Sequence, residues 1–381
     1  MKVLFISNDP TIFNAKSPAR ARMRTYAALV TELHIVTPAP FNSVSVVEGT
    51  LYLHPVSAWR LFRVGILSRR AHSLIHEYGI EIVAAQDPFE EGLAALRATR
   101  GTTTKLYIQV HTDFLSPWFI RSGNWRSPQV RMPFLNRIRR RIADHVLPAA
   151  DGIRVVSERI KESLLLRYGS RIVKPSVIPI AVDATVPEPV RLPDHPFTFA
   201  LIAVGRLEPE KRVEDILAAL KLVNAHYPMV GLFIVGDGRE RGRLERMTHK
   251  LGLSQQVQFI PGWQPAETAW GLIRSAQAFI QASAYEGYGR TLIEAALAKV
   301  PIITTDVGIV GEVFKGYEDV LAVPVADPTA LSLSIVGFIE DNAVRQELPR
   351  HAEDTARAHL ASVGDIPARI AADLASTLQS V

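Results

Sequence analysis

The stretch EGYGRTLIE, residues 286–294, decides the fold and sets two carboxylates eight positions apart around a glycine-containing turn. It follows AQAFIQAS (276–283), a short apolar run typical of a buried parallel strand. It leads into TLIEAALA (291–298), whose apolar spacing predicts a helix. The first amides of such a helix favour a phosphate, and the glycines allow the backbone to approach a ligand. The stretch therefore predicts a phosphate site with Glu286 in a loop and Glu294 one turn into the helix.

Similar strand and helix patterns fill the chain on both sides of a proline-rich linker at 181–196. This alternation is typical of doubly wound parallel sheets, so we expect two Rossmann-like α/β domains facing each other across a cleft. The expected first domain is 1–180, the second is 197–362, and a last helix lies within 363–381. Strands are expected at KVLFIS, LHIVT, IEIVAAQ, KLYIQV, GIRVVS and VKPSVIPI in the first domain, with helices around 19–31, 59–78, 89–100 and 158–168.

Composition limits the classes of protein that the chain can represent. Of the 381 residues 48% are hydrophobic and 21% are charged, as in a globular protein. The absence of cysteine excludes disulfides, thiolate metal sites and a cysteine nucleophile. The start, MKVLFISNDP, is too short for a signal sequence or a membrane span, and no later segment reaches 18 apolar residues. We therefore expect a cytoplasmic protein.

Positive charge is concentrated in the first half of the chain. Residues 1–195 hold 26 Lys and Arg against 16 Asp and Glu, a net charge of +10, so the remainder carries −5 of the total of +5. The segment 114–143 has seven arginines and no acid, with aromatic residues between them. Three readings stay open: an anionic membrane or lipid-linked acceptor, an ordinary solvated arginine face, and nucleic acid, which we do not expect because no nucleic-acid module accompanies the segment. The expected patch is Trp118, Arg121, Trp125, Arg126, Arg131, Arg137, Arg139, Arg140 and Arg141.

Four motifs in order resemble those of the retaining family 4 glycosyltransferases of the GT-B type. EGYGRTLIEAALAKVP (286–301) is similar to the Glu-x7-Glu motif of that family, EGFGLxxLEAxAxGxP. AVGRLEPEKR (203–212), VGDGRERGRLE (235–245) and TTDVGIVGEV (304–313) resemble the family turns that follow three further strands. HTDF (111–114) and VVSE (155–158) give a weaker likeness in the first half. The resemblance implies a nucleotide-sugar transferase whose last helix crosses back to the first domain.

The resemblance also implies a role for each matched residue. Arg206 and Lys211 would stabilise the negative charge that builds on the leaving diphosphate, and Glu286 would bind the hydroxyls of the donor sugar. Glu294 would bind the ribose hydroxyls. Arg212 stands where the family usually has glycine, which bears on the geometry of this loop. The implied donor-binding set is Gly205, Arg206, Lys211, Glu286, Gly287, Tyr288, Gly289, Arg290, Thr291 and Glu294, with contacts to the base near 259–262.

The first half offers weaker candidates for the acceptor side. His111 follows the strand KLYIQV, where the family places a histidine near the reacting centre, and it is the fourth expected catalytic residue beside Arg206, Lys211 and Glu286. Asp113 is a further candidate, although an Asp there often caps a turn. No glycine precedes Gly49, so the loop 7–24 lacks the glycines that many family members have. Asn8, Ser17 and Arg20 either supply donors to acceptor or phosphate, or belong to a lid.

The expected function is retaining transfer of a sugar from a nucleotide-sugar donor, UDP- or GDP-linked, to a glycan or lipid-linked acceptor, with peripheral contact at the inner face of the membrane. The chain has no Asp-x-Asp motif, so we expect no metal ion and no other cofactor. Two alternatives remain: a hydrolase or epimerase of nucleotide sugars, and a non-catalytic module that binds membrane surfaces. The same fold supports each of them.

Overall fold

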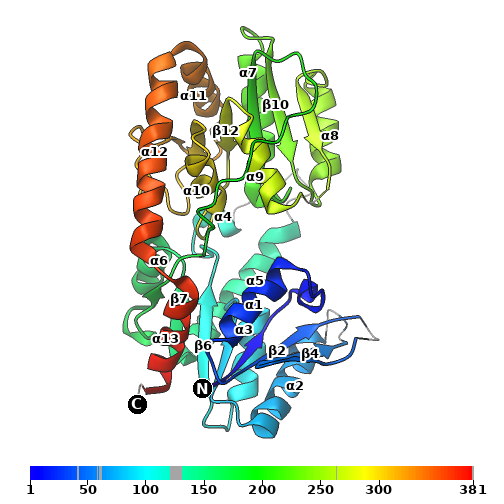
Figure 1. Ribbon diagram of the computed structural model, residues 1–381, viewed down its shortest axis with the longest axis vertical. Helices are drawn as coiled ribbons and strands as arrows, with labels where there is room; N and C mark the ends of the chain where they lie inside the picture. The colour runs from blue at the N-terminus through cyan, green and yellow to red at the C-terminus, as the bar shows by residue number, and fades with distance from the viewer. Residues whose placement is uncertain (41–42, 58, 60–61, 121–130, 263, 380–381) are drawn as a thin grey trace. The chain divides into compact units, whose positions relative to one another are not determined.

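The computed structural model describes residues 1–40, 43–57, 59, 62–120, 131–262 and 264–379. The chain divides into two compact units (Figure 1). Unit 1 comprises Met1–Leu115, Arg131–Pro179 and Asp365–Val381, and unit 2 comprises Ser116–Val130 and Ile180–Gly364. The chain thus passes from unit 1 to unit 2 after Pro179. Residues 116–120 and the proline-rich stretch both group with unit 2.

Unit 1 is built on an eight-stranded sheet in the order β3-β4-β2-β1-β5-β6-β7-β8. Every pairing is parallel except that of β3 with β4. Buried parallel strands read as apolar runs, as in the fully buried IVAA of β5. The strands are β1 (Lys2–Ile6), β2 (Glu32–Pro38), β3 (Val46–Glu48), β4 (Leu51–Val56), β5 (Ile82–Ala85), β6 (Lys105–Val110), β7 (Gly152–Val155) and β8 (Ser176–Val177).

The helices of unit 1 connect these strands and pack on the sheet. Ser157 caps α6 through its side chain, which accepts a hydrogen bond from the Ile160 amide. The last helix, α13, packs on β6 and β7, and its Asp373 accepts hydrogen bonds from Tyr107 and Ser176. The helices are η1 (Pro10–Phe13), α1 (Pro18–Ala27), α2 (Arg63–Tyr78), α3 (Glu90–Thr99), α5 (Arg131–Val146), η3 (Leu147–Ala149), α6 (Glu158–Tyr168), η4 (Gly169–Arg171) and α13 (Ile366–Gln379).

Unit 2 is built on a six-stranded parallel sheet in the order β11-β10-β9-β12-β13-β14. The helix α7 packs on β10 and β12 and buries one apolar face, and α11 lies beside α7 (Figure 1). The strands are β9 (Phe199–Val204), β10 (Val230–Val235), β11 (Val257–Ile260), β12 (Ala278–Gln281), β13 (Ile302–Thr305) and β14 (Leu321–Val323). The helices are α4 (Pro117–Ile120), η5 (Pro209–Lys211), α7 (Val213–Val223), α8 (Arg241–Lys250), α9 (Ala266–Arg274), α10 (Arg290–Leu297), α11 (Pro328–Glu340) and α12 (Asn342–Val363).

The predicted pair of Rossmann-like α/β domains is confirmed, and the differences concern single elements. The helix expected around 59–78 begins at Arg63, and the strand expected over 173–180 is reduced to two residues. Strand β4 has no counterpart among the predicted elements because its sequence, LYLHPV, contains a proline. Pro55 is tolerated in this parallel pairing beside Thr37.

Candidate active site

The site begins where β9 and β10 of unit 2 end side by side. Gly205 follows β9 with φ +154°, and Gly236 follows β10 with φ +132°. A Cβ atom on Gly236 would lie 2.1 Å from the carbonyl oxygen of Gly205, a separation that no side chain allows. Position 236 therefore requires glycine, which allows the ends of β9 and β10 to lie side by side at the base of the site.

Lys211 and Glu286 form an ion pair near these strand ends, although they are 75 residues apart in the sequence. Lys211 ends the short helix η5 after β9, and Glu286 lies in the loop after β12. The Lys211 ammonium donates to Oε1 of Glu286, and Ser283 Oγ donates to the same oxygen at 2.7 Å. Both side chains of the ion pair are mostly buried, with 20% and 14% exposed. A cation and a carboxylate held in this way present one group suited to phosphate and one suited to sugar hydroxyls.

Arg206 lines the same pocket as Lys211, and its side chain is more exposed. Its side chain is 59% exposed, and Nη2 lies 3.3 Å from Oε1 of Glu210. The carbonyl oxygen of Glu210 also accepts a hydrogen bond from the Ala284 amide at 2.7 Å, which ties the loop after β9 to the loop after β12. The backbone around Arg206 is therefore fixed, while its guanidinium is exposed and accessible to a ligand.

Arg212 adopts the left-handed conformation that glycine favours, with φ 46° and ψ 42°. Its guanidinium donates to both oxygens of Asp215, at 2.6 and 3.0 Å. It also lies over the ring of Trp118, with 5.4 Å between Cζ and the ring centroid. These contacts offset backbone strain of about 1 kcal/mol. The substitution of the family's glycine thus leaves the left-handed turn in place.

The helix α10 begins where the sequence predicts a helix N-terminus, and its binding of phosphate stays a prediction. Gly289 precedes it with φ 94°, and the helix begins at Arg290. Thr291 Oγ1 donates to Gln281 Oε1 at 3.0 Å, which ties the first turn of the helix to the end of β12. Glu294 pairs with Arg290 at 2.9 Å. Burial raises the pKa of Glu294, although the Arg290 guanidinium opposes this effect.

Tyr288 contributes to the site through its main chain, because its ring belongs to the core. The side chain is 2% exposed, and its hydroxyl lies 2.7 Å from Nε2 of His359. A Cβ atom on Gly308 would lie 2.5 Å from the Tyr288 carbonyl oxygen and 3.0 Å from Cβ of Glu286. The turn after β13 therefore supports the loop that carries Glu286, Gly287 and Tyr288.

A pocket between the ends of β9 and β12 and the start of α7 is lined in part by residues that the sequence did not single out. Gln281 and Ser283 line it together with Gly205, Arg206 and Lys211. Gln281 is 6% exposed, and its Nε2 has no hydrogen-bond partner among the described residues. An unpaired buried amide is costly unless a ligand accepts its hydrogen bond. The signal in the sequence is a polar residue at the end of an otherwise apolar strand, in AFIQ.

Unit 1 places His111 directly after β6, as predicted, beside two partners that were not predicted. Its Nε2 lies 3.3 Å from Gln109 Oε1 and 3.5 Å from Nη1 of Arg154. Burial, and then the positive charge of Arg154, lowers the pKa of His111 to about 3. The imidazole is therefore neutral at physiological pH. Asp113 is buried two residues further along the chain.

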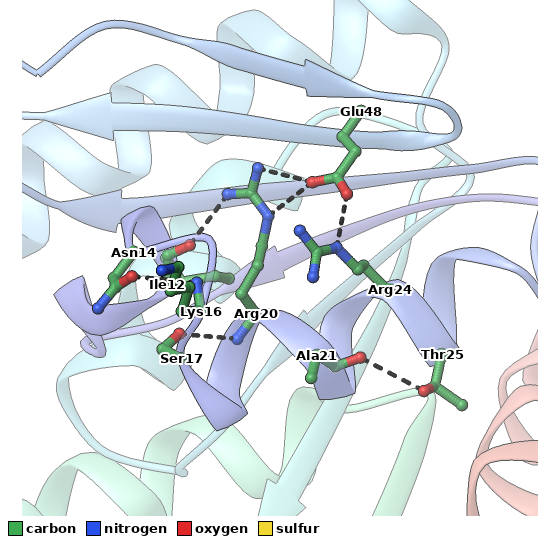
Figure 2. Close-up of polar contacts among 9 residues, drawn as sticks. All are labelled: Ile12, Asn14, Lys16, Ser17, Arg20, Ala21, Arg24, Thr25 and Glu48. Carbon is green, nitrogen blue, oxygen red and sulfur yellow. Dashed lines mark hydrogen bonds and ion pairs between the residues drawn. The ribbon is translucent and has the colours of Figure 1, made fainter.

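The loop 7–24 is held by contacts within unit 1 (Figure 2). Ser17 caps α1, because its hydroxyl oxygen accepts a hydrogen bond from the Arg20 amide at 3.1 Å. Arg20 is 3% exposed, donates to the Ile12 carbonyl oxygen at 3.0 Å and pairs with Glu48 at 2.8 Å. The structure thus gives Ser17 and Arg20 structural partners, and their role toward an acceptor stays a prediction. Asn8 is exposed and accepts a hydrogen bond from Arg63 at 3.4 Å.

The structure describes only part of the predicted basic patch. Trp118 lies under Arg212, and Arg139 donates to both oxygens of Glu90 at 3.0 and 3.1 Å. Arg137 and Arg141 of α5 are exposed and Arg140 is partly exposed, and the nearby Phe134 is 71% exposed. Arg121, Trp125, Arg126 and the side chain of Arg131 lie outside the described residues.

Two features are absent from the part of the chain that the structure describes. No group of three or more His, Asp or Glu side chains within the described residues is arranged to hold a metal ion. In the same residues, none of the helices combines the length and the apolar character needed to cross a bilayer.

Comparison with known proteins identifies the family. Residues 195–359 match the model of the glycosyl transferases group 1, and residues 23–186 match that of glycosyltransferase family 4. The chain is 31% identical over 159 residues to the lipopolysaccharide core biosynthesis glycosyltransferase LpsD of Rhizobium meliloti, which covers 42% of this chain and 44% of LpsD. The match thus spans less than half the length of that relative.

Solved structures share the fold at low sequence identity. Sucrose-phosphate synthase from Thermosynechococcus elongatus has a TM-score of 0.78 at 19% identity, covering 100% of this chain and 99% of that chain. HepE of Anabaena in complex with UDP-glucose has a TM-score of 0.73 at 18% identity, covering 99% of this chain and 100% of that chain. Because both halves match models of one family and the GT-B fold extends over the whole chain, this protein belongs to the group 1 glycosyltransferases of family 4.

Proposed function

We propose that this protein transfers a sugar from a UDP-linked donor to a glycan or lipid-linked acceptor of the cell envelope, with retention of configuration and without a divalent metal ion. The observation that carries the proposal is the Lys211–Glu286 pair, with Ser283 on the same carboxylate and the start of α10 a few residues along the chain. This arrangement combines a phosphate-binding cation, a sugar-binding carboxylate and a helix N-terminus.

In the proposed reaction the bond between C1 of the sugar and the β-phosphate oxygen breaks, and a bond from C1 to the acceptor oxygen forms on the same face. The acceptor proton passes to the departing phosphate oxygen, so no enzymic nucleophile is required. Lys211 and Arg206 stabilise the charge on the leaving diphosphate, and Glu286 holds the donor sugar. The neutral His111 of unit 1 is the proposed hydrogen-bond donor to the substrate. Glu294 binds the ribose. UDP is preferred over GDP because HepE, which shares the fold, was solved with UDP-glucose.

The test is donor binding measured by thermal shift and isothermal titration. UDP, GDP, ADP and UDP-glucose are compared on the wild type and Glu294→Ala, with magnesium and with EDTA. We expect UDP and UDP-glucose to raise the melting temperature equally with and without magnesium. Glu294→Ala should abolish this rise. Glu245→Ala is the matched control, because Glu245 also pairs with an arginine four positions away, at 2.9 Å, but lies on α8.

Turnover separates the proposed transfer from its alternatives. Release of UDP from UDP-glucose alone, unchanged by any glycan acceptor, would indicate a hydrolase. An absence of binding by every nucleotide would contradict the transferase and favour a non-catalytic module. Magnesium-dependent binding would contradict the metal-independent form of the proposal.

Contact with an anionic membrane at the cytoplasmic face is the second part of the proposal. It is supported by Phe134, Arg137 and Arg141, which are exposed on α5. Co-sedimentation with vesicles of phosphatidylglycerol and phosphatidylcholine should exceed that with phosphatidylcholine alone. The double substitution Arg137→Glu and Arg141→Glu should remove the difference, whereas Arg246→Glu on α8 should retain it. Equal sedimentation with both vesicles would contradict this part.

A further inference from the structure

Arg154 is a charged side chain inside the parallel sheet of unit 1. It lies on β7, and the residue is 4% exposed. Its Nε donates to the Ile178 carbonyl oxygen at 3.0 Å, and Nη2 donates to the Pro179 carbonyl oxygen at 2.7 Å. Nη1 donates to Gln109 Oε1 at 2.5 Å and lies 3.5 Å from Nε2 of His111. One guanidinium thus joins the end of β6 to the last two residues before the chain enters unit 2.

The four groups that this guanidinium contacts are neutral, although burying a cation without a charged partner is costly. The forked contacts use all three guanidinium nitrogens, so the position of the charge is fixed. A hydrophobic residue would suit this strand at lower cost, since its flanking residues Ile153 and Val155 are apolar and buried. Packing alone therefore does not explain the charge of Arg154. Its neighbour His111 is the group whose protonation the charge affects.

Arginine can only donate a hydrogen bond, so an imidazole nitrogen that accepts from Arg154 carries no hydrogen. Nε2 of His111 lies 3.5 Å from Nη1 of Arg154 and 3.3 Å from Gln109 Oε1, an oxygen that also accepts from Arg154 and has a second lone pair. If Nε2 accepts from the fixed Arg154 donor, the hydrogen of the neutral imidazole lies on Nδ1.

We propose that Arg154 is a positioning residue for His111: it donates to Nε2, fixes the imidazole and keeps it in the neutral Nδ1–H form, which can donate to the substrate. This role rests on the proposed function for its catalytic consequence. The titratable groups that act on this region are Arg22 of α1, which also lowers the pKa of His111, and Tyr107, Tyr26, Asp373 and Arg369, which interact electrostatically with Arg154.

The test uses Arg154→Met, which removes the charge and the fork, and Arg154→Lys, which keeps the charge and loses the fork. The control is Arg171→Met, because Arg171 also donates to two main-chain carbonyls, of Tyr168 and Arg167, at 3.2 and 3.0 Å. The first measurement is ¹⁵N NMR of histidine-labelled protein without substrate, with the His111 signals assigned from His111→Gln. The second is UDP release from UDP-glucose.

We expect the Nδ1–H form in the wild type and no titration of His111 above pH 5. In Arg154→Met the signals should move toward the Nε2–H form, because Gln109 then accepts from His111, and the pKa of His111 should rise by about one unit or more. Turnover should fall about tenfold or more in Arg154→Met and Arg154→Lys, with KM for UDP-glucose within about twofold. Arg154→Lys and Arg171→Met should leave the titration of His111 unchanged.

The NMR measurement tests the role of Arg154 and does not require turnover. An absence of turnover in the wild type would count against the proposed function and not against the role of Arg154. A folded Arg154→Met protein with the wild-type tautomer and titration of His111 would overturn the role of Arg154. If Arg154→Met does not fold, Arg154→Lys decides, and wild-type turnover in that variant would overturn it.

Discussion

The two sheets of this protein have a similar parallel architecture but differ in where they hold polar groups. The central strands β9 and β10 of unit 2, FALIAV and VGLFIV, are apolar, and the ionised side chains of the site lie in the loops that follow strands. Unit 1 instead buries His34, His54 and Arg154 on its strands, each at most 4% exposed. In unit 2 the central strands are thus apolar and the charged residues of the site lie outside them. In unit 1 the sheet itself contains buried side chains that titrate or carry charge.

The largest expected effect concerns the Lys211–Glu286 pair of unit 2 and tests whether this pair takes part in the reaction. Lys211→Met should lower the turnover of UDP-glucose by about 10²- to 10³-fold, the usual loss for one fixed donor to developing charge. The melting temperature should also fall, because the mostly buried Glu286 carboxylate loses its charged partner. Initial-rate kinetics measure the effect, with Lys250→Met at the end of α8 as control. A loss of less than about threefold would show that the pair is structural.

The next effect tests whether the sheet of unit 1 is sensitive to acid. His54 Nε2 lies 3.0 Å from Nδ1 of His34, whose Nε2 lies 3.1 Å from Glu32. Burial, and then the charge of His34, lowers the pKa of His54 to about 4, and burial also lowers that of His34. The unfolded chain therefore binds more protons below about pH 6.5, so the free energy of unfolding falls as the pH falls toward 4.

For His54 alone this loss amounts to as much as about 3 kcal/mol between pH 6.5 and 4. Lys2, Arg70, Glu77 and Tyr78 also face the two imidazoles or their partners and set the background. Urea unfolding at pH 7 and pH 4.5 measures the loss, and His54→Gln should reduce it. His226→Gln, at an exposed position of unit 2, is the control. An equal loss in wild type and His54→Gln would show that acid sensitivity arises elsewhere.

A smaller effect concerns the strained turn beside the site in unit 2. Arg212→Ala keeps the unfavourable positive φ but leaves Asp215, which is 6% exposed, without its ion pair. We expect the free energy of unfolding to fall by about 2 kcal/mol, within the range for a buried group that loses its partner. Arg206→Ala removes an exposed pair and should change the stability by less than about 0.5 kcal/mol. Denaturant titration compares the two, and equal losses would contradict this account.

The smallest effect contrasts two buried glutamines, one in each sheet. Gln281→Met removes the Nε2 that is unpaired among the described residues but also the Oε1 that accepts from Thr291, so the free energy of unfolding should change by less than about 1 kcal/mol. Gln109→Met deprives Arg154 of a partner and should lower it. Gln281→Met should also weaken the binding of UDP-glucose in isothermal titration. Unchanged affinity would indicate that this amide does not contact the donor.

Much of unit 2 could be predicted because its local patterns agree with its tertiary structure. Apolar runs became buried strands, and Glu286 and Glu294 lie in a loop and in the first turns of α10 as predicted. Gln281 was missed because a polar residue at a strand end gives no sign of whether its amide finds a partner. In unit 1, β4 was missed because Pro55 interrupts its pattern, and Arg154 was missed because a single arginine in a strand resembles a surface residue.

The sequence by itself determined the two α/β domains, the family motifs and the residue types of the donor site, because periodicity and glycine positions are properties of local sequence. Only the tertiary structure decided the partner of each charged group. Lys211 meets Glu286 across 75 residues, Arg20 pairs with Glu48 across 28 residues, and Arg154 reaches His111 across 43 residues. Electrostatic interactions depend on distance and burial, and the fold sets both of these for groups far apart in the chain.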